Sequence, residues 1–129
     1  MGQPTHVLLV EGDPKLRDLY ASVLVDDGFR VTTACNFAEA LAKNFLHRPE
    51  VAILDADAEP NGTETALELT RVNPGVSVVF LTASPYLVGR DFQAWVADAL
   101  APKTEDAVGL CRAVRRACGS AGEGGDPDS

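Results

Sequence analysis

The sequence predicts an α/β domain in which a doubly wound (βα)5 chain forms a five-stranded parallel sheet with helices on both faces. Short apolar runs alternate with segments of helical periodicity along the chain. Runs at residues 6–10, 51–54 and 76–81 are almost entirely apolar, which is typical of strands buried on both faces of a parallel sheet. Parallel strands need right-handed crossover connections, and these place helices over both faces. The 129 residues give room for one such domain.

The first strand, at residues 6–10, leads into the acidic turn Glu11-Gly12-Asp13-Pro14. Asp13 and Pro14 are expected as N-cap and first-turn residue of an amphipathic helix. Gly28 suits the left-handed position at the end of this helix.

The second strand is expected at residues 29–35, near an edge of the sheet because it is richer in Thr. Asn36 is predicted to cap the next helix. Phe37, Leu41 and Phe45 recur every fourth residue along that helix and mark its apolar stripe.

The third strand ends on Asp55, where a carboxylate at the end of a buried run is a candidate for chemistry or the start of a turn. A loop through Gly62 follows. Thr63 is then expected to cap a helix whose Ala66, Leu67 and Thr70 face inward.

The fourth strand ends at Thr82, and a helix is expected around residues 88–96. A short strand at residues 98–101 precedes Lys103, and a last helix is expected from about residue 104 to 118. The domain is therefore predicted to span residues 1–118. Residues 119–129 are poor in apolar side chains and are predicted to be a disordered tail or the start of a linker.

Composition excludes several classes of protein. The formal charge of −8 argues against direct contact with nucleic acid, which needs clustered Lys and Arg. No apolar run is long enough for a membrane span and no signal peptide is recognisable, so we expect a cytoplasmic protein without membrane contact. The three cysteines are unpatterned and are expected to be free thiols, and the two histidines are expected at the surface.

The carboxyl ends of parallel strands meet at one rim of the sheet, so five polar side chains are expected to converge there. They are Glu11, Asp13, Asp55, Thr82 and Lys103. Clustered carboxylates favour a bound cation, and oxygen ligands favour Mg²⁺. Thr82 and Lys103 are then suited to hold a phosphoryl group.

These residues and their surroundings resemble the receiver domains of two-component response regulators. The resemblance covers residues 6 to about 117, and five segments carry it: VLLVEGDPKLR (7–17), GFRVTTACNFAEAL (28–41), PEVAILD (49–55), VVFLTAS (78–84) and ADALAPK (97–103). It implies a flavodoxin-like fold and a role in phosphorelay signal transduction, not an enzyme.

The resemblance also implies roles for single residues. Asp55 is expected to accept a phosphoryl group from a histidine kinase or phosphotransfer protein, with Thr82 as switch hydroxyl and Lys103 as phosphoryl contact. Glu11, Asp55 and the backbone carbonyl of Asp57 are the implied Mg²⁺ ligands, with Asp13 left open. Phosphorylation is expected to switch the face formed by the fourth helix, fifth strand and fifth helix toward a downstream protein target.

The departures from the family pattern matter equally. Gly12 stands where such domains carry a second acid, which predicts weak Mg²⁺ binding. Two explanations for a glycine at position 12 remain open. Either the chain has lost a Mg²⁺ ligand there, or the turn needs a residue with positive φ. Leu100 replaces the expected aromatic switch residue, and Thr104 replaces the proline expected after the lysine. The loop after Asp55 is also rebuilt.

Two hypotheses remain open from the sequence. The chain is a working receiver, or it is a degenerate pseudo-receiver that binds proteins independently of phosphorylation. A small α/β enzyme is disfavoured, because no Gly-rich phosphate loop follows the first strand.

Overall fold

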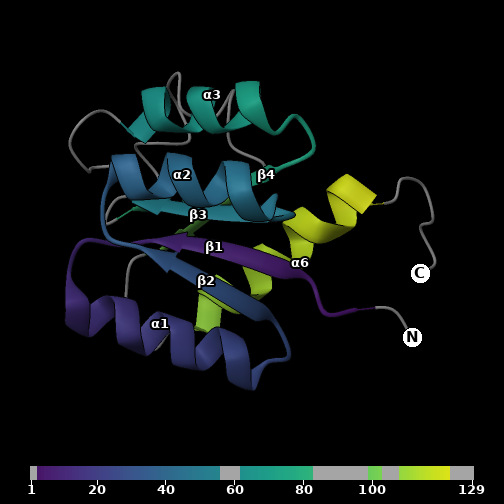
Figure 1. Ribbon diagram of the computed structural model, residues 1–129. Coiled ribbons are helices and arrows are strands. Elements are labelled where there is room, and N and C mark those ends of the chain that lie inside the picture. Colours follow the sequence, from purple (N-terminus) through teal and green to yellow (C-terminus); the bar gives the residue numbers. More distant parts are fainter. Residues whose placement is uncertain (1–2, 56–61, 83–98, 103–107, 123–129) are drawn as a thin grey trace.

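A five-stranded parallel sheet runs through the middle of the molecule, with two helices on each face among the parts described (Figure 1). The computed structural model describes residues 3–55, 62–82, 99–102 and 108–122, with the backbone alone at residues 63, 82, 99–102, 108 and 119–122. The strands are β1 His6–Val10, β2 Arg30–Ala34, β3 Val51–Asp55, β4 Ser77–Thr82 and β5 Ala99–Pro102. The helices are α1 Pro14–Asp26, α2 Phe37–His47, α3 Gly62–Val72 and α6 Val108–Gly122.

The strand order β2-β1-β3-β4-β5 confirms the predicted doubly wound, flavodoxin-like α/β fold. Every pairing is parallel, and β2 lies at an edge, as its more polar sequence predicted. The strand that ends on Asp55 is the central one. Asp55 therefore stands in the middle of the carboxyl edge, where a doubly wound sheet places its ligand crevice.

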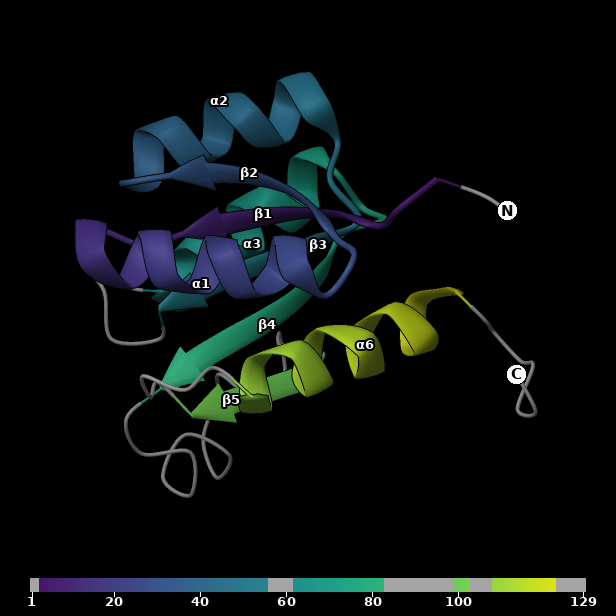
Figure 2. The same ribbon diagram turned by 90° about the horizontal axis from the view of Figure 1, so that it is seen from below.

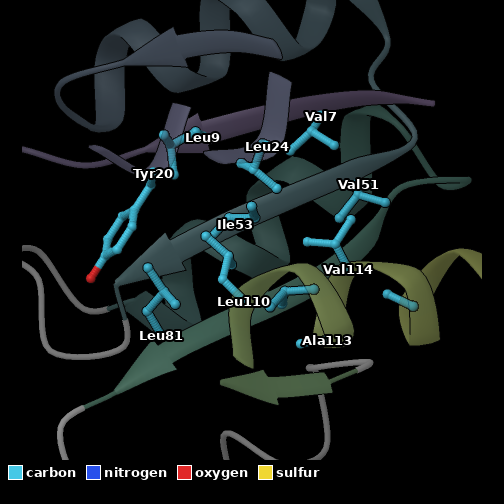
Figure 3. Close-up of a cluster of buried hydrophobic side chains, with 12 residues drawn as sticks. Val7, Leu9, Tyr20, Leu24, Val51, Ile53, Leu81, Leu110, Ala113 and Val114 are labelled. Atoms are coloured by element: carbon cyan, nitrogen blue, oxygen red, sulfur yellow. The ribbon is translucent and has the colours of Figure 1, made fainter. Parts of the chain in front are cut away.

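Alternate residues of each central strand enter two different cores, because successive side chains of a strand point to opposite faces. On one face Val7, Ile53 and Leu81 pack with residues of α1 and α6 (Figure 3). On the other face Leu8 and Leu54 pack with residues of α2 and α3. Figure 2 shows α1 and α6 together on the first of these faces. The continuous apolar runs reflect this burial on both sides.

The helix ends follow the expected chemistry. The Asp13 carboxylate accepts a hydrogen bond from the Lys15 N–H at 2.9 Å and caps α1, and Gly28 after this helix has a φ of 99°. Asn36 caps α2 by accepting from the Glu39 N–H at 2.8 Å. These three sequence predictions are confirmed.

The apolar stripe of α2 does not coincide with its buried face. Phe45 is 60% exposed, whereas Asn44 is fully buried. The Asn44 side-chain amide donates to the Leu69 carbonyl at 3.1 Å and accepts from the Asn73 amide at 3.1 Å. Asn73 also donates to the Pro49 carbonyl. Hydrogen bonding across three elements thus allows a polar residue in the core.

Three further expectations are corrected. Leu67 and Thr70 of α3 are exposed, and Leu69 is buried beside Ala66 instead. His6 is only 7% exposed, with its Nε2 atom 2.6 Å from the Thr32 hydroxyl, although His47 is at the surface as expected.

The last helix continues to Gly122, four residues beyond the end at residue 118 that the sequence predicted for it. The helix expected around residues 88–96 lies outside the described residues. All three cysteines are free, as predicted.

The outer edge of β2 is partly closed by a side chain from α2. The Lys43 ammonium donates to the Thr33 carbonyl at 2.6 Å and lies 3.8 Å from the Glu39 carboxylate. Arg30 and Glu11 make the backbone hydrogen bonds that join the two ends of β2 to the β1 side. Since alternate residues of a strand face opposite neighbours, the Thr33 carbonyl points away from β1.

Candidate functional site

A cavity of about 350 Å³ opens at the carboxyl edge of the sheet, between the ends of β1, β2 and β3. Its lining brings together three of the predicted site residues, Glu11, Asp13 and Asp55. They come from segments more than 40 positions apart in the sequence. The parallel sheet is what places them in one cavity, as the convergence of strand ends predicted.

The turn after β1 is held by its own hydrogen bonds. Glu11 is 3% exposed, and its Oε2 atom accepts from the Asp13 N–H at 3.1 Å. Arg17 reaches back from α1 to donate to the Glu11 carbonyl at 2.9 Å. Asp13 is engaged in capping α1. The buried acid of this turn is therefore Glu11, while Asp13 has a structural role besides lining the cavity.

Gly12 lies exposed in the same turn and lines the cavity. Among the described glycines, only Gly28 has a positive φ, so the backbone of Gly12 does not require glycine. A Cβ atom added at Gly12 would lie 3.6 Å from the Cys35 carbonyl oxygen, an ordinary contact. The alternative in which Gly12 serves a turn with positive φ is therefore wrong, and the position has room for a side chain.

The turn between β2 and α2 forms a wall of the cavity that the sequence analysis missed. Cys35, Asn36 and Phe37 line it. The Glu39 carboxylate accepts from the Cys35 N–H at 2.7 Å, and this hydrogen bond lowers the pKa of Glu39 below its usual value. The sequence did contain a signal for this wall. β2 was predicted as a parallel strand, so the turn after it was expected at the same rim as the ends of the other strands.

Asp55 is the last residue of β3 and pairs with Leu81 of β4, so Thr82 follows at the same edge on the neighbouring strand. The backbone of Thr82 in turn pairs with Pro102, the last residue of β5. Lys103 would come next, but Lys103 and Asp57 lie outside the described residues. Their predicted roles stay predictions.

Glu11, Asp13 and Asp55 bring carboxylate oxygens to the cavity, and oxygen atoms are the ligands that Mg²⁺ prefers. Within the described parts of the chain, no group of three or more His, Cys, Asp or Glu residues is arranged to hold a metal ion. Mg²⁺ is often bound through one or two carboxylates together with water and phosphate oxygens. The pair Glu11 and Asp55 fits this mode of binding and does not form a complete protein cage.

None of the described helices combines the length and the apolar character that crossing a bilayer requires.

Curated relatives match a little under two thirds of this chain. The probable transcriptional regulatory protein TcrX of Mycobacterium tuberculosis is 35% identical over 83 residues, which are 64% of this chain and 36% of TcrX. The transcriptional regulatory protein GlrR of Escherichia coli K12 is 37% identical over 84 residues, 63% of this chain and 18% of GlrR. The chain thus matches about a third or less of each relative's length.

Solved structures share the fold over nearly the whole chain. The response regulator TrrA of Thermotoga maritima in complex with Mg²⁺-BeF has a TM-score of 0.77 at 28% identity, covering 87% of this chain and 97% of TrrA. TrrA in complex with the histidine kinase ThkA gives a TM-score of 0.76 at the same identity and the same coverage of both chains. A CheY-like receiver domain of Methanospirillum hungatei is alike in fold, with a TM-score of 0.82 at 22% identity over 95% of this chain and all of that one.

The family model of the response regulator receiver domain matches residues 7–114, a range that contains β2 to β5, all of β1 except His6, and every residue that lines the cavity. The parallel order of the sheet and the acid that ends its central strand agree with this match. The chain therefore belongs to the family of response regulator receiver domains, the phosphorelay modules of two-component signalling.

Proposed function

We propose that this protein is a working receiver in which Asp55 accepts a phosphoryl group from a histidine kinase or a phosphotransfer protein. One observation carries the proposal: Asp55 ends the central strand and shares a cavity of about 350 Å³ with the buried carboxylate of Glu11. A side chain at the end of a rigid central strand is held in place for reaction.

The reaction is a transfer between two covalent carriers. A carboxylate oxygen of Asp55 attacks the phosphorus of a phosphohistidine on the donor, and a new P–O bond forms as the P–N bond breaks. The departing imidazole nitrogen keeps the bonding pair and takes up a proton. Asp55 is left as an acyl phosphate, and Thr82 and Lys103 are proposed to contact its oxygens.

Glu11 and Asp55 would hold Mg²⁺, together with the backbone carbonyl of Asp57. The Asp13 carboxylate caps α1 by accepting the hydrogen bond from the Lys15 N–H. The ion supplies positive charge to the phosphoryl oxygens during transfer. Because Gly12 contributes no carboxylate, we propose that Mg²⁺ binds weakly in the absence of a phosphoryl group. The hydrogen bonds of the β1–α1 turn, together with the one from the Glu11 N–H to the Ala34 carbonyl, keep Glu11 in position for this task.

The consequence of phosphorylation is proposed to be a change in protein binding, not turnover of a substrate. The aspartyl phosphate would bias two states of the face that includes β5 and α6, and a downstream protein would bind one of them. A kinase partner is supported by the structure of TrrA with the histidine kinase ThkA. The acidic charge of −8 supports partners other than nucleic acid, and we propose a cytoplasmic location.

A pseudo-receiver is the second candidate, and Gly12 is the observation that favours it. The position has space for a side chain and a backbone that permits one, yet it carries no acid. In this case the fold would present protein-binding surfaces without being phosphorylated.

Intact mass after incubation with acetyl phosphate and Mg²⁺ separates the two candidates. The working receiver should gain the mass of one phosphoryl group. Asp55→Asn should abolish this gain and Asp57→Asn should retain it, since Asp57 lies beyond the strand. The reverse pair of results contradicts the assignment, and no gain in the native protein favours the pseudo-receiver.

A further inference from the structure

A second hollow, which we call the α2–α3 groove, lies beside the Asp55 cavity. It has a volume of about 250 Å³ and is lined by Phe37 of α2 and by Glu64, Leu67 and Glu68 of α3. Leu67 is 47% exposed. The groove thus combines an apolar floor with two carboxylates, a combination that suits recognition of an amphipathic segment.

We propose that the α2–α3 groove is a docking site for a basic amphipathic helix of a partner protein. An apolar side chain of that helix would enter between Phe37 and Leu67. Lys or Arg residues one turn apart on the partner would face Glu64 and Glu68, which are themselves one turn apart on α3.

The charges around the groove select a basic partner. Glu64 forms no ion pair within the described parts of the chain. Glu68 pairs with Arg71 at 2.8 Å, but both side chains are more than 40% exposed, so the pair contributes little and is open to exchange. The chain as a whole carries a charge of −8, which attracts basic segments at long range.

Two other occupants fit less well. A second copy of the chain carries the same net charge of −8 and is repelled at long range. Residues 123–129 contain three acids and no Lys or Arg, so this segment does not complement Glu64 and Glu68.

Phe37 gives the groove a connection to the phosphorylation site. This residue lines both the groove and the cavity that contains Asp55 and Glu11. A helix in the groove and a group bound at Asp55 would therefore both lie beside Phe37. This link rests on the proposed function of Asp55, whereas docking in the groove does not.

Docking is tested with the full chain and a labelled synthetic helix that carries Leu on one face and Lys and Arg on the other. Fluorescence anisotropy should show saturable binding that weakens with added salt. Leu67→Asp should weaken binding about tenfold or more, because a charge replaces the apolar floor. Val25→Asp is the matched control: Val25 is 55% exposed on α1, and its replacement should leave the affinity unchanged.

Charge reversal adds a variant that does not depend on the apolar contact. Glu64→Lys should weaken binding of the basic helix and strengthen binding of a helix in which Glu replaces the basic residues. Equal binding of a scrambled peptide of the same composition would overturn the proposal, because charge alone would then explain the affinity. Equal loss in Val25→Asp, or self-association of the native protein that Leu67→Asp abolishes, would also overturn it.

The link through Phe37 is tested by adding Mg²⁺ and beryllofluoride. The peptide affinity should change in the native protein and stay constant in Asp55→Asn. An unchanged affinity in the native protein overturns the link. Failure of Asp55 to accept a phosphoryl group, measured separately by mass, leaves the docking results above unaffected.

Discussion

Placing an acid at position 12 is the sharpest test of the proposed Mg²⁺ site. Gly12 has no positive φ, and an added Cβ atom meets only the Cys35 carbonyl oxygen at 3.6 Å. Gly12→Ala should therefore be neutral or stabilise the fold by up to about 1 kcal/mol, because it removes freedom from the unfolded chain only. Any larger effect of Gly12→Asp then comes from its charge.

The size of that effect follows from Coulomb's law. The new carboxylate would line the same cavity as those of Glu11 and Asp55, and two carboxylates about 7 Å apart repel each other by about 2 kcal/mol at an effective dielectric constant of 20. Exposure of position 12 and added salt reduce the net cost to about 1–2 kcal/mol in total. For a domain of this size we expect a Tm lower by about 5 °C without Mg²⁺.

Mg²⁺ should cancel this loss of stability. An attraction of about 2 kcal/mol for the ion corresponds to roughly 30-fold tighter binding. At a Mg²⁺ concentration 100 times the Kd of Gly12→Asp, binding raises the stability of this variant by about 2.7 kcal/mol and that of the native protein by about 0.9 kcal/mol. The Tm of Gly12→Asp should then rise to about that of the native protein.

Thermal melts of native, Gly12→Ala and Gly12→Asp protein across a Mg²⁺ titration provide the assay. An ion-dependent rise that is much larger in Gly12→Asp is the expected result. Equal destabilisation of both variants at every Mg²⁺ concentration would refute the reasoning, since it would mean that the turn itself needs glycine.

Three further predictions concern the fold and its titrating groups. Asn44→Ala should lower the free energy of unfolding by about 2–4 kcal/mol in urea denaturation, because it leaves the buried Leu69 carbonyl without its donor; a loss below about 1 kcal/mol would contradict this role. Burial and nearby Arg30 lower the pKa of His6 below 6.5. The unfolded chain therefore binds this proton more readily, so stability should fall as pH decreases below about 6.5, and it should fall less in His6→Gln, as followed by melts at several pH values. Pulsed alkylation should label exposed Cys35 before Cys118, whose pKa is raised by burial; equal rates measured by mass spectrometry would argue against this ranking.

Strand positions and helix caps were predictable because they depend on local sequence. Consecutive apolar residues before Asp55 are required of any strand covered on both faces, and Asn36 or Asp13 caps a helix through hydrogen bonds spanning two or three residues. The convergence of Glu11 with Asp55 followed in turn from the parallel order of the strands. These features need no knowledge of distant side chains.

The burial of polar groups was not predictable in the same way. Asn44 can be buried because it forms hydrogen bonds with Leu69 and Asn73. These partners lie 25 and 29 positions away, so the sequence of α2 alone does not indicate them. His6 is likewise satisfied by Thr32 on the neighbouring strand. Polarity alone suggests exposure for both residues, and only the tertiary arrangement reverses that expectation.

Faces of helices were predicted incompletely for a related reason. On α3 the residues expected inward included Leu67, yet Leu69 is buried and Leu67 is half exposed. Residue type alone does not distinguish an apolar residue on the surface from one in the core. The discrepancy is informative here, because Leu67 is the residue that forms the floor of the α2–α3 groove.

The lysine at the edge of β2 bears on aggregation. An uncovered edge strand offers unpaired carbonyl and amide groups on which another chain can extend the sheet. Lys43 occupies one of these carbonyls, that of Thr33, and keeps a positive charge where an incoming strand would have to lie. This contact therefore disfavours edge-to-edge polymerisation on the β2 side of the sheet.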